Sequence, residues 1–414
     1  MQFTGRLSAL RHPNYFRYWS GSFASVGATQ LQTMAQGWLL YELTQSAVVL
    51  GYLGAATAIP AILMTMFGGA VADRFNKKYV LMTTSMLVAI MMMLLAFLDY
   101  TDVVLQWHVI LIAAIVSFIS GFDWPTRQSI FPKLIDREDM LSAVALNSII
   151  WQSSRMVMPA LGGILLAFTD TWLVFLFCAV GYVAMFLVVA GLKISLPGKK
   201  PDHSTLRQIS EGLNYIFTER LFLTFISLSY LSMFFCMTHI QLMPALADLI
   251  GASEQGYGWL LSATGVGSII GTLLIGSAQE SKHLGRVIFS TAACAAFSLL
   301  LFMLIVQFAN TIPVAYLLAL IAVALTSMFS SMFMITSMTV MQLKVPDYLR
   351  GRVMGLHGIT YSLMPLGGLF AGLLASVTSV PVAIAIGVVI YLCILAGIAL
   401  GQKELVNLSG RSDI

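Results

Sequence analysis

Ionisable side chains within long apolar stretches are the residues of this sequence that could do chemistry. Asp123 and Arg127, in FDWPTRQS, are four residues apart, so on a helix they share one face and can form an ion pair. Arg155 lies about 15 residues, or about 22 Å, into the following apolar stretch, which is near the middle of a bilayer. Because charges at that depth are costly, such residues mark pathways for protons or for a polar substrate.

Each of these charges has two interpretations. Asp123 could carry protons, whereas the simpler interpretation is an ion pair that also ties its helix to the charged hairpin around Asp73. Arg155 could bind an anionic or polyphenolic substrate, since a guanidinium favours negative charge, or it could be satisfied by backbone carbonyls and water. We favour the ion pair for Asp123 and the substrate contact for Arg155.

Further residues are weaker candidates for contact with protons or substrate. Glu42 could accept a proton, although a carboxylate beside Tyr and Trp at a membrane interface is common. His239 could relay protons in the physiological range, or it could be a satisfied histidine inside a helix bundle. Met233, Met237 and Phe333 belong to stretches rich in Met and Phe. Such stretches suit a large or varied apolar substrate, but they would equally fill lipid-facing positions.

Membrane helices must position these residues, because the composition excludes a soluble protein. Of the 414 residues, 58% are hydrophobic and only 10% are charged. A span needs about 20 apolar residues. The sequence contains twelve such stretches and no room for a soluble domain. The cysteines are scattered through apolar stretches, so we expect no disulfide, metal site or cofactor.

A charged hairpin separates the second and third apolar stretches. It reads GGAVADRFNKKYVL at 68–81. The glycines let two helices approach closely, and the aspartate can cap a helix N-terminus or pair with a base. The candidate gating residues of this hairpin are Gly68, Gly69, Asp73, Arg74, Lys77 and Lys78.

The distribution of charge predicts the orientation in the membrane. Lys and Arg fill the loops on one side, and the loops on the other side carry only acidic charges. By the positive-inside rule, both termini are cytoplasmic. The first apolar stretch is longer than a signal-peptide core and lacks a small-residue cleavage site, so we expect it to be retained.

The chain repeats itself in two halves. The hairpin at 68–80 aligns with 276–288, and PALGG at 159–163 has a counterpart in PLGG at 365–368. Pro allows a bend and paired Gly a tight helix contact, which makes these residues a helix-packing motif: Pro159, Gly162, Gly163, Pro365, Gly367 and Gly368. The expected organisation is an N-terminal six-helix bundle at 1–192, a cytoplasmic linker at 193–220, a C-terminal six-helix bundle at 221–402 and a cytoplasmic tail at 403–414.

The linker contains its own periodic pattern. Leu206, Ile209 and Leu213 recur at helical spacing, which predicts an amphipathic helix on the cytoplasmic membrane surface. A regulatory or partner-binding segment is the alternative.

The hairpin resembles the signature loop of the major facilitator superfamily, G-x-L-a-D-r-x-G-r-K. The matching residues are Gly68, Asp73, Arg74 and Lys78. The hairpin departs from the pattern at Asn76, where the superfamily usually has Gly, and Asn tolerates the left-handed conformation. It also departs at Lys77, which replaces a frequent Arg. The resemblance implies an all-α fold of twelve transmembrane helices in two pseudo-symmetric six-helix bundles. It also implies that Asp73, Lys77 and Asp123 hold the cytoplasmic face closed in the outward-open state.

Segments such as NYFRYW at 14–19 and LSAVALN at 141–147 look like the drug and siderophore exporter branch of that superfamily. MPALGG at 158–163 is similar to the exporter motif G-P-x-x-G-G, with Met158 in place of the first Gly. The likeness implies a multi-pass protein of a bacterial inner membrane. Such a protein would export a hydrophobic or amphiphilic small molecule by proton antiport and alternating access.

Other functions are weighed against export. Within transport, the alternatives are an importer of a small solute and a lysophospholipid transporter. A membrane sensor is the alternative from another class. An enzyme is not expected, because no Ser/Lys pair, paired Asp or His/Glu metal constellation falls near the bilayer centre, and no P-loop is present. The expected partners are a small-molecule substrate, protons and the lipid bilayer; we expect no nucleic acid and a monomeric state.

Overall fold

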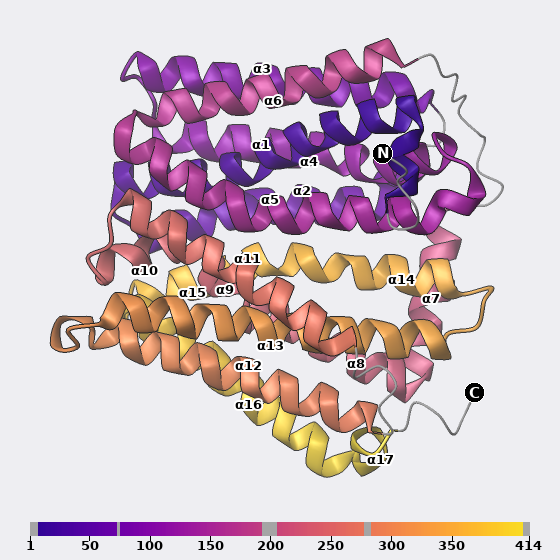
Figure 1. Ribbon diagram of the computed structural model, residues 1–414. Coiled ribbons are helices and arrows are strands. Elements are labelled where there is room, and N and C mark those ends of the chain that lie inside the picture. The colour runs from indigo at the N-terminus through magenta and orange to yellow at the C-terminus, as the bar shows by residue number, and fades with distance from the viewer. Residues whose placement is uncertain (1–6, 73–74, 193–204, 277–282, 409–414) are drawn as a thin grey trace. The chain divides into compact units, whose positions relative to one another are not determined.

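The structure is a computed structural model that describes residues 7–72, 75–192, 205–276 and 283–408 (Figure 1). Within these residues the regular structure is helical, without a β-strand. Eleven segments of the described chain are long and apolar enough to cross a membrane. The helix α1, Pro13–Thr44, is also long enough to span, but its many polar residues keep it outside that set. The predicted all-α polytopic fold class is confirmed.

The chain forms two compact units. The first comprises Met1–Leu43 and Ile59–Thr205, and the second comprises Thr44–Ala58 and Leu206–Ile414. The helix α2, Ala47–Ala72, therefore contributes its first half to the second unit and its second half to the first. The domain boundaries expected from the sequence remain a prediction.

The first unit is built from long helices, of which α3 runs along α6 and also packs against α4 (Figure 1). Asn76 caps the N-terminus of α3. Its side chain accepts a hydrogen bond of 3.0 Å from the backbone N–H of Lys78. Besides α1 and the second half of α2, these helices are α3 Lys77–Tyr100, α4 Gln106–Ile130, α5 Met140–Phe168 and α6 Thr171–Gly191.

Aromatic side chains of α1 fix this helix against α5. The hydroxyl of Tyr15 donates to the carbonyl oxygen of Ala143 at 3.0 Å, and the indole N–H of Trp19 donates to that of Leu146 at 3.2 Å. Farther along the same pair of helices, a Cβ atom on Gly162 would lie 2.6 Å from the sulfur of Met34. The two helices therefore approach so closely that only glycine fits there without displacing its neighbour.

The second unit contains two interrupted spans, and interrupted helices at membrane depth are tolerated only where protein or a cavity surrounds them. A π-helical segment, Ser232–Cys236, interrupts the span Arg220–Gln241, and a 3-10 segment, Ile359–Ser362, interrupts the span Arg350–Ala375. The helices of this unit are α8 Arg220–Leu231, α9 Thr238–Gln241, α10 Met243–Leu249, α11 Glu254–Gly276, α12 Leu284–Gln307, α13 Ala315–Lys344, α14 Arg350–Gly358, α15 Leu363–Ala375, α16 Val380–Gly401 and α17 Lys403–Val406.

A helix also occupies part of the predicted linker. This helix, α7, spans Thr205–Thr218 and packs on the beginning of α14 within the second unit. Its Glu211 carboxylate forms an ion pair with Arg352 of α14. Leu213 and Phe217 remain exposed, with Phe217 67% accessible, so the helix keeps an apolar surface available to a lipid headgroup region.

Candidate functional site

The first unit encloses a pocket of about 160 Å³ between α1, α3, α4, α5 and α6. Four kinds of side chain form its walls, and Val26 and Val88 provide the aliphatic kind. Thr29, Thr84 and Tyr182 contribute hydroxyl groups, and Trp124 and Trp151 contribute indole rings. The remaining kind is a charged pair, so the pocket combines an apolar surface with a small number of polar groups, as ligand sites do.

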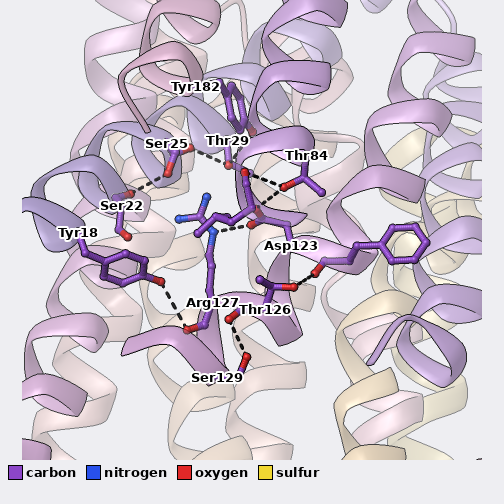
Figure 2. Close-up of polar contacts among 12 residues, drawn as sticks. Tyr18, Ser22, Ser25, Thr29, Thr84, Asp123, Thr126, Arg127, Ser129 and Tyr182 are labelled. Carbon is purple, nitrogen blue, oxygen red and sulfur yellow. Dashed lines mark hydrogen bonds and ion pairs between the residues drawn. The ribbon is translucent and has the colours of Figure 1, made fainter. Parts of the chain in front are cut away.

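The charged pair is Asp123 with Arg127, both on α4. The Nε–H of Arg127 donates to one carboxylate oxygen of Asp123, as their four-residue spacing predicts. The hydroxyl of Thr84, from α3, donates to the other carboxylate oxygen at 3.1 Å. Figure 2 shows the guanidinium beside the carboxylate, with Thr29 and Tyr182 on the opposite side of Asp123 from Thr126. The Arg127 side chain is 11% exposed and that of Asp123 is 22% exposed, so both charges are largely removed from water.

Arg127 is incompletely satisfied in this arrangement. Its Nη1 is buried and has no hydrogen-bond partner among the described residues. A buried polar group without a partner costs about 1–3 kcal/mol, and more when it is charged.

A line of polar side chains leads away from the pocket along α1. The hydroxyls of Thr29 and Tyr182 lie 2.9 Å apart. The Tyr182 hydroxyl also donates to the Gln32 side-chain oxygen at 3.3 Å, and the Gln32 amide donates to that of Gln36 at 3.4 Å. Because α1 runs on from Thr29 towards Gln36, these groups provide a polar path from the Asp123 pocket towards the C-terminal end of α1.

Two tryptophans give the pocket its aromatic wall. The rings of Trp124, on α4, and Trp151, on α5, meet edge to face with their centroids 5.2 Å apart. Trp124 directly follows Asp123 in the sequence, so the charged pair and the aromatic wall are positioned by the same turn of α4. The arrangement can hold a flat molecule against the indoles with a polar group directed at the carboxylate.

The other candidates in and near the first unit lie outside this pocket. Arg155 is partly buried on α5, one turn beyond Trp151, and does not belong to the described lining. Glu42 is exposed near the C-terminal end of α1. The packing residue Pro159 lies inside α5, near the contact of Gly162 with α1 described above, and Gly163 is buried on the same helix.

Most candidates in the second unit lie in or beside the interrupted span Arg220–Gln241. Met233 and Met237 are buried there, and Phe333 is buried on α13. His239 is fully buried on α9, and its Nδ1 lies 2.8 Å from the carbonyl oxygen of Cys236, to which the Nδ1–H donates. In α15, the Pro365 carbonyl leaves no room for a Cβ on Gly54 of α2. Gly367 beside the Phe234 carbonyl and Gly368 beside Gln241 also have no room for an added Cβ.

The charged hairpin is only partly described. Gly68 and Gly69 lie in the last turns of α2, whereas Asp73 and Arg74 lie outside the described residues. The expected gate among Asp73, Lys77 and Asp123 therefore stays a prediction. Lys78 lies near the start of α3, and its ammonium group donates to carbonyl oxygens at the end of α6.

Sequence reasoning missed much of the pocket. The sequence alone does not identify Thr84, Tyr182 and the two tryptophans as lining residues, because their meeting depends on how four helices pack. One signal was present: polar residues recur every three or four positions along α1, at Ser25, Thr29, Gln32 and Gln36. A polar stripe on an otherwise apolar membrane helix indicates the face that lines a polar interior.

Comparison with known proteins places the chain in a family. The transmembrane secretion effector family matches residues 4–410. The staphyloferrin A transporter of Staphylococcus aureus is 26% identical over 87% of this chain and 89% of its own. The enterobactin exporter EntS of Escherichia coli is 24% identical over 84% of this chain and 82% of its own.

A solved structure shows the same fold. The crystal structure of the nucleoside transporter NupG has a TM-score of 0.74 and 14% sequence identity. The alignment covers 94% of this chain and 99% of that one. The chain therefore belongs to the transmembrane secretion effector family and is a multi-pass transporter of the major facilitator superfamily.

Proposed function

We propose that this protein exports a hydrophobic or amphiphilic small molecule, drug-like or siderophore-like, across a bacterial inner membrane by proton antiport and alternating access. Family membership supports transport, and a relative that is itself named an exporter supports the direction. The observation that carries the proposal is the Asp123 carboxylate, a protonatable group held between Arg127 and Thr84 on the wall of an aromatic pocket.

Protonation of Asp123 supplies the coupling in this proposal. A proton on the carboxylate removes its charge and weakens the hold on Arg127, whose Nη1 already lacks a partner among the described residues. The freed guanidinium can then change partner, which links the proton to a conformational change. The polar path through Tyr182 and Gln32 supports access of protons to this pocket. In the outward-open state, we expect Asp123 to join Asp73 and Lys77 in closing the cytoplasmic face.

The orientation is part of the proposal. Basic loops on one side of the predicted spans support cytoplasmic placement of both termini in the inner membrane. Reporter fusions at each terminus test this: a reporter that is active only in the cytoplasm should be active at both ends.

The export proposal is tested by accumulation of labelled compounds in efflux-deficient bacterial cells. The panel contains a catecholate siderophore, a macrolide and a lipophilic cation, each with and without a protonophore. Cells that produce the protein should accumulate less of at least one class, and the protonophore should abolish the difference. Asp123→Asn, produced at the same level in the membrane, provides the inactive control.

Other outcomes point to the alternatives. Increased accumulation of a compound would support an importer and contradict export. No change for any compound, together with uptake of a labelled lysophospholipid, would support a lipid transporter instead.

A further inference from the structure

We infer that the pocket beside Asp123 binds one neutral hydroxylated aromatic ring, a phenol or a catechol, as one arm of the transported molecule. The inference rests on the proposed function and specifies the chemistry of its substrate. Charge, hydrogen-bonding capacity and shape of the pocket support it independently.

The charge of the pocket favours a neutral ligand. Asp123 and Arg127 form an ion pair, so their formal charges cancel, and the other described lining residues are uncharged. A cation or an anion that enters such a site loses its hydration without meeting a net opposite charge. A neutral group with a hydrogen-bond donor avoids that cost.

The carboxylate of Asp123 is the acceptor for this donor. An ionised carboxylate offers about four lone-pair sites. Among the described residues, the Nε of Arg127 and the hydroxyl of Thr84 occupy two of them. With 22% of its side chain exposed, Asp123 can be reached from the pocket. A hydroxyl that donates to a charged oxygen makes one of the stronger hydrogen bonds in proteins.

The shape of the pocket selects a flat ring. Trp124 and Trp151 form an edge-to-face wall, and Val26 and Val88 add apolar surface. The volume of about 160 Å³ suits a single ring. A cavity of about 150 Å³ binds benzene in another protein. A whole drug or chelator exceeds this volume, so the pocket holds one arm of it.

The same hydrogen bond gives the sign of coupling that antiport requires. A ligand hydroxyl that donates to the ionised carboxylate competes with a proton for Asp123. Ligand and proton therefore weaken each other's binding, and this effect is reciprocal. An anionic group bound to Arg127 would act in the opposite sense, because protonation of Asp123 would release Arg127 to bind it.

Binding of small probes to the full chain in lipid nanodiscs tests the inference. Phenol is compared with anisole, and catechol with 1,2-dimethoxybenzene, by saturation-transfer NMR, with empty nanodiscs as the blank for partition into lipid. The methylated probes keep the ring but lack the donor. We expect each hydroxylated probe to bind at least tenfold more tightly than its methylated partner. Asp123→Asn should reduce this preference, because an amide oxygen is a neutral and weaker acceptor than a carboxylate.

Two controls separate the site from general damage. Asp99 is a carboxylate of the same unit that does not belong to the described pocket lining and accepts a hydrogen bond from Thr171. Asp99→Asn should leave the ratio of the affinities for phenol and anisole unchanged. Trp151→Leu should weaken the binding of the hydroxylated probe and of its methylated partner by the same factor. If Asp123→Asn does not fold, the pH dependence of the wild-type protein replaces it. Phenol binding should then weaken as the pH is lowered, whereas anisole binding should not.

Among the residues that the structure describes, the charged and titratable groups that face Asp123 are Arg127 on its own helix, Tyr18 on α1 and Tyr182 on α6. All three already carry their protons at neutral pH, so none of them changes charge as the pH is lowered. Equal binding of phenol and anisole would overturn the inference even if the cells export the panel. Conversely, a tenfold preference in a protein that exports nothing would contradict the proposed function alone.

Discussion

The ammonium group of Lys78 donates a hydrogen bond of 2.6 Å to the carbonyl oxygen of Leu192, just beyond the last residue of α6. The same group reaches the carbonyl of Ala190 at 2.9 Å. The last carbonyls of a helix have no partner within the helix and carry partial negative charge, so a cation stabilises them. One basic residue of the hairpin therefore joins the start of α3 to the end of α6.

Replacing Lys78 should loosen this junction. Lys78→Gln should lower the free energy of unfolding by about 1 kcal/mol, because a partly exposed charged donor to helix carbonyls is lost. Thermal unfolding of the purified protein in detergent measures the change. Lys133→Gln, an exposed lysine of the same unit, is the matched control and should unfold like the wild type.

The charged pair should be essential for coupled transport. Asp123→Asn should reduce protonophore-sensitive export at least tenfold, because the residue can no longer exchange a proton. Initial rates of efflux from loaded cells measure the effect. Asp99→Asn should retain the wild-type rate; equal losses in both variants would mean that Asp123 has no specific part in coupling.

Close helix packing in the second unit should make Gly367 sensitive to substitution. A Cβ at this position would collide with the carbonyl oxygen of Phe234, whereas a Cβ on Gly397 would meet nothing within 4 Å. Gly367→Ala should therefore destabilise the protein by about 1–3 kcal/mol. Gly397→Ala should be neutral or stabilise α16 by up to about 1 kcal/mol, because alanine favours helix. Melting temperatures of the two variants, compared side by side, decide the point.

Arg155 provides a test of substrate charge. Arg155→Ala should abolish export of an anionic compound and spare the lipophilic cation of the panel, while folded protein stays in the membrane. It should leave the phenol-to-anisole ratio unchanged, because Arg155 does not belong to the described pocket lining. Full export of an anionic compound by this variant would remove Arg155 from the substrate site.

Local features of the site followed from the sequence. The four-residue spacing of Asp123 and Arg127 predicted a shared helix face, and their ion pair is present. The third partner, Thr84, could not be predicted in the same way, because it lies 39 positions away and meets Asp123 only through the packing of α3 on α4. Spacing along one helix determines which residues share a face, whereas contacts between helices depend on rotation and register.

The fold showed the same division between local and long-range information. Apolar stretches located the spans, since a bilayer imposes their length and composition. The hydropathy of the sequence does not predict that Thr44–Ala58 belongs to the second unit. It depends on contacts such as that of Gly51, where an added Cβ would lie 2.9 Å from the Cα of Leu369. The hydrogen bond of 3.0 Å from the Gln241 amide to the Leu50 carbonyl has the same effect.

The division of α2 between the two units has a mechanical consequence. The two halves of α2 belong to different units, but α2 is one continuous hydrogen-bonded helix. Any rotation of one unit relative to the other must therefore bend α2 within Ala47–Ala72. Pro60 lies next to the division at Ala58, and its ring removes one backbone hydrogen bond at that level. The bending stiffness of α2 is therefore lowest beside the boundary at Ala58 that assigns its two halves to different units.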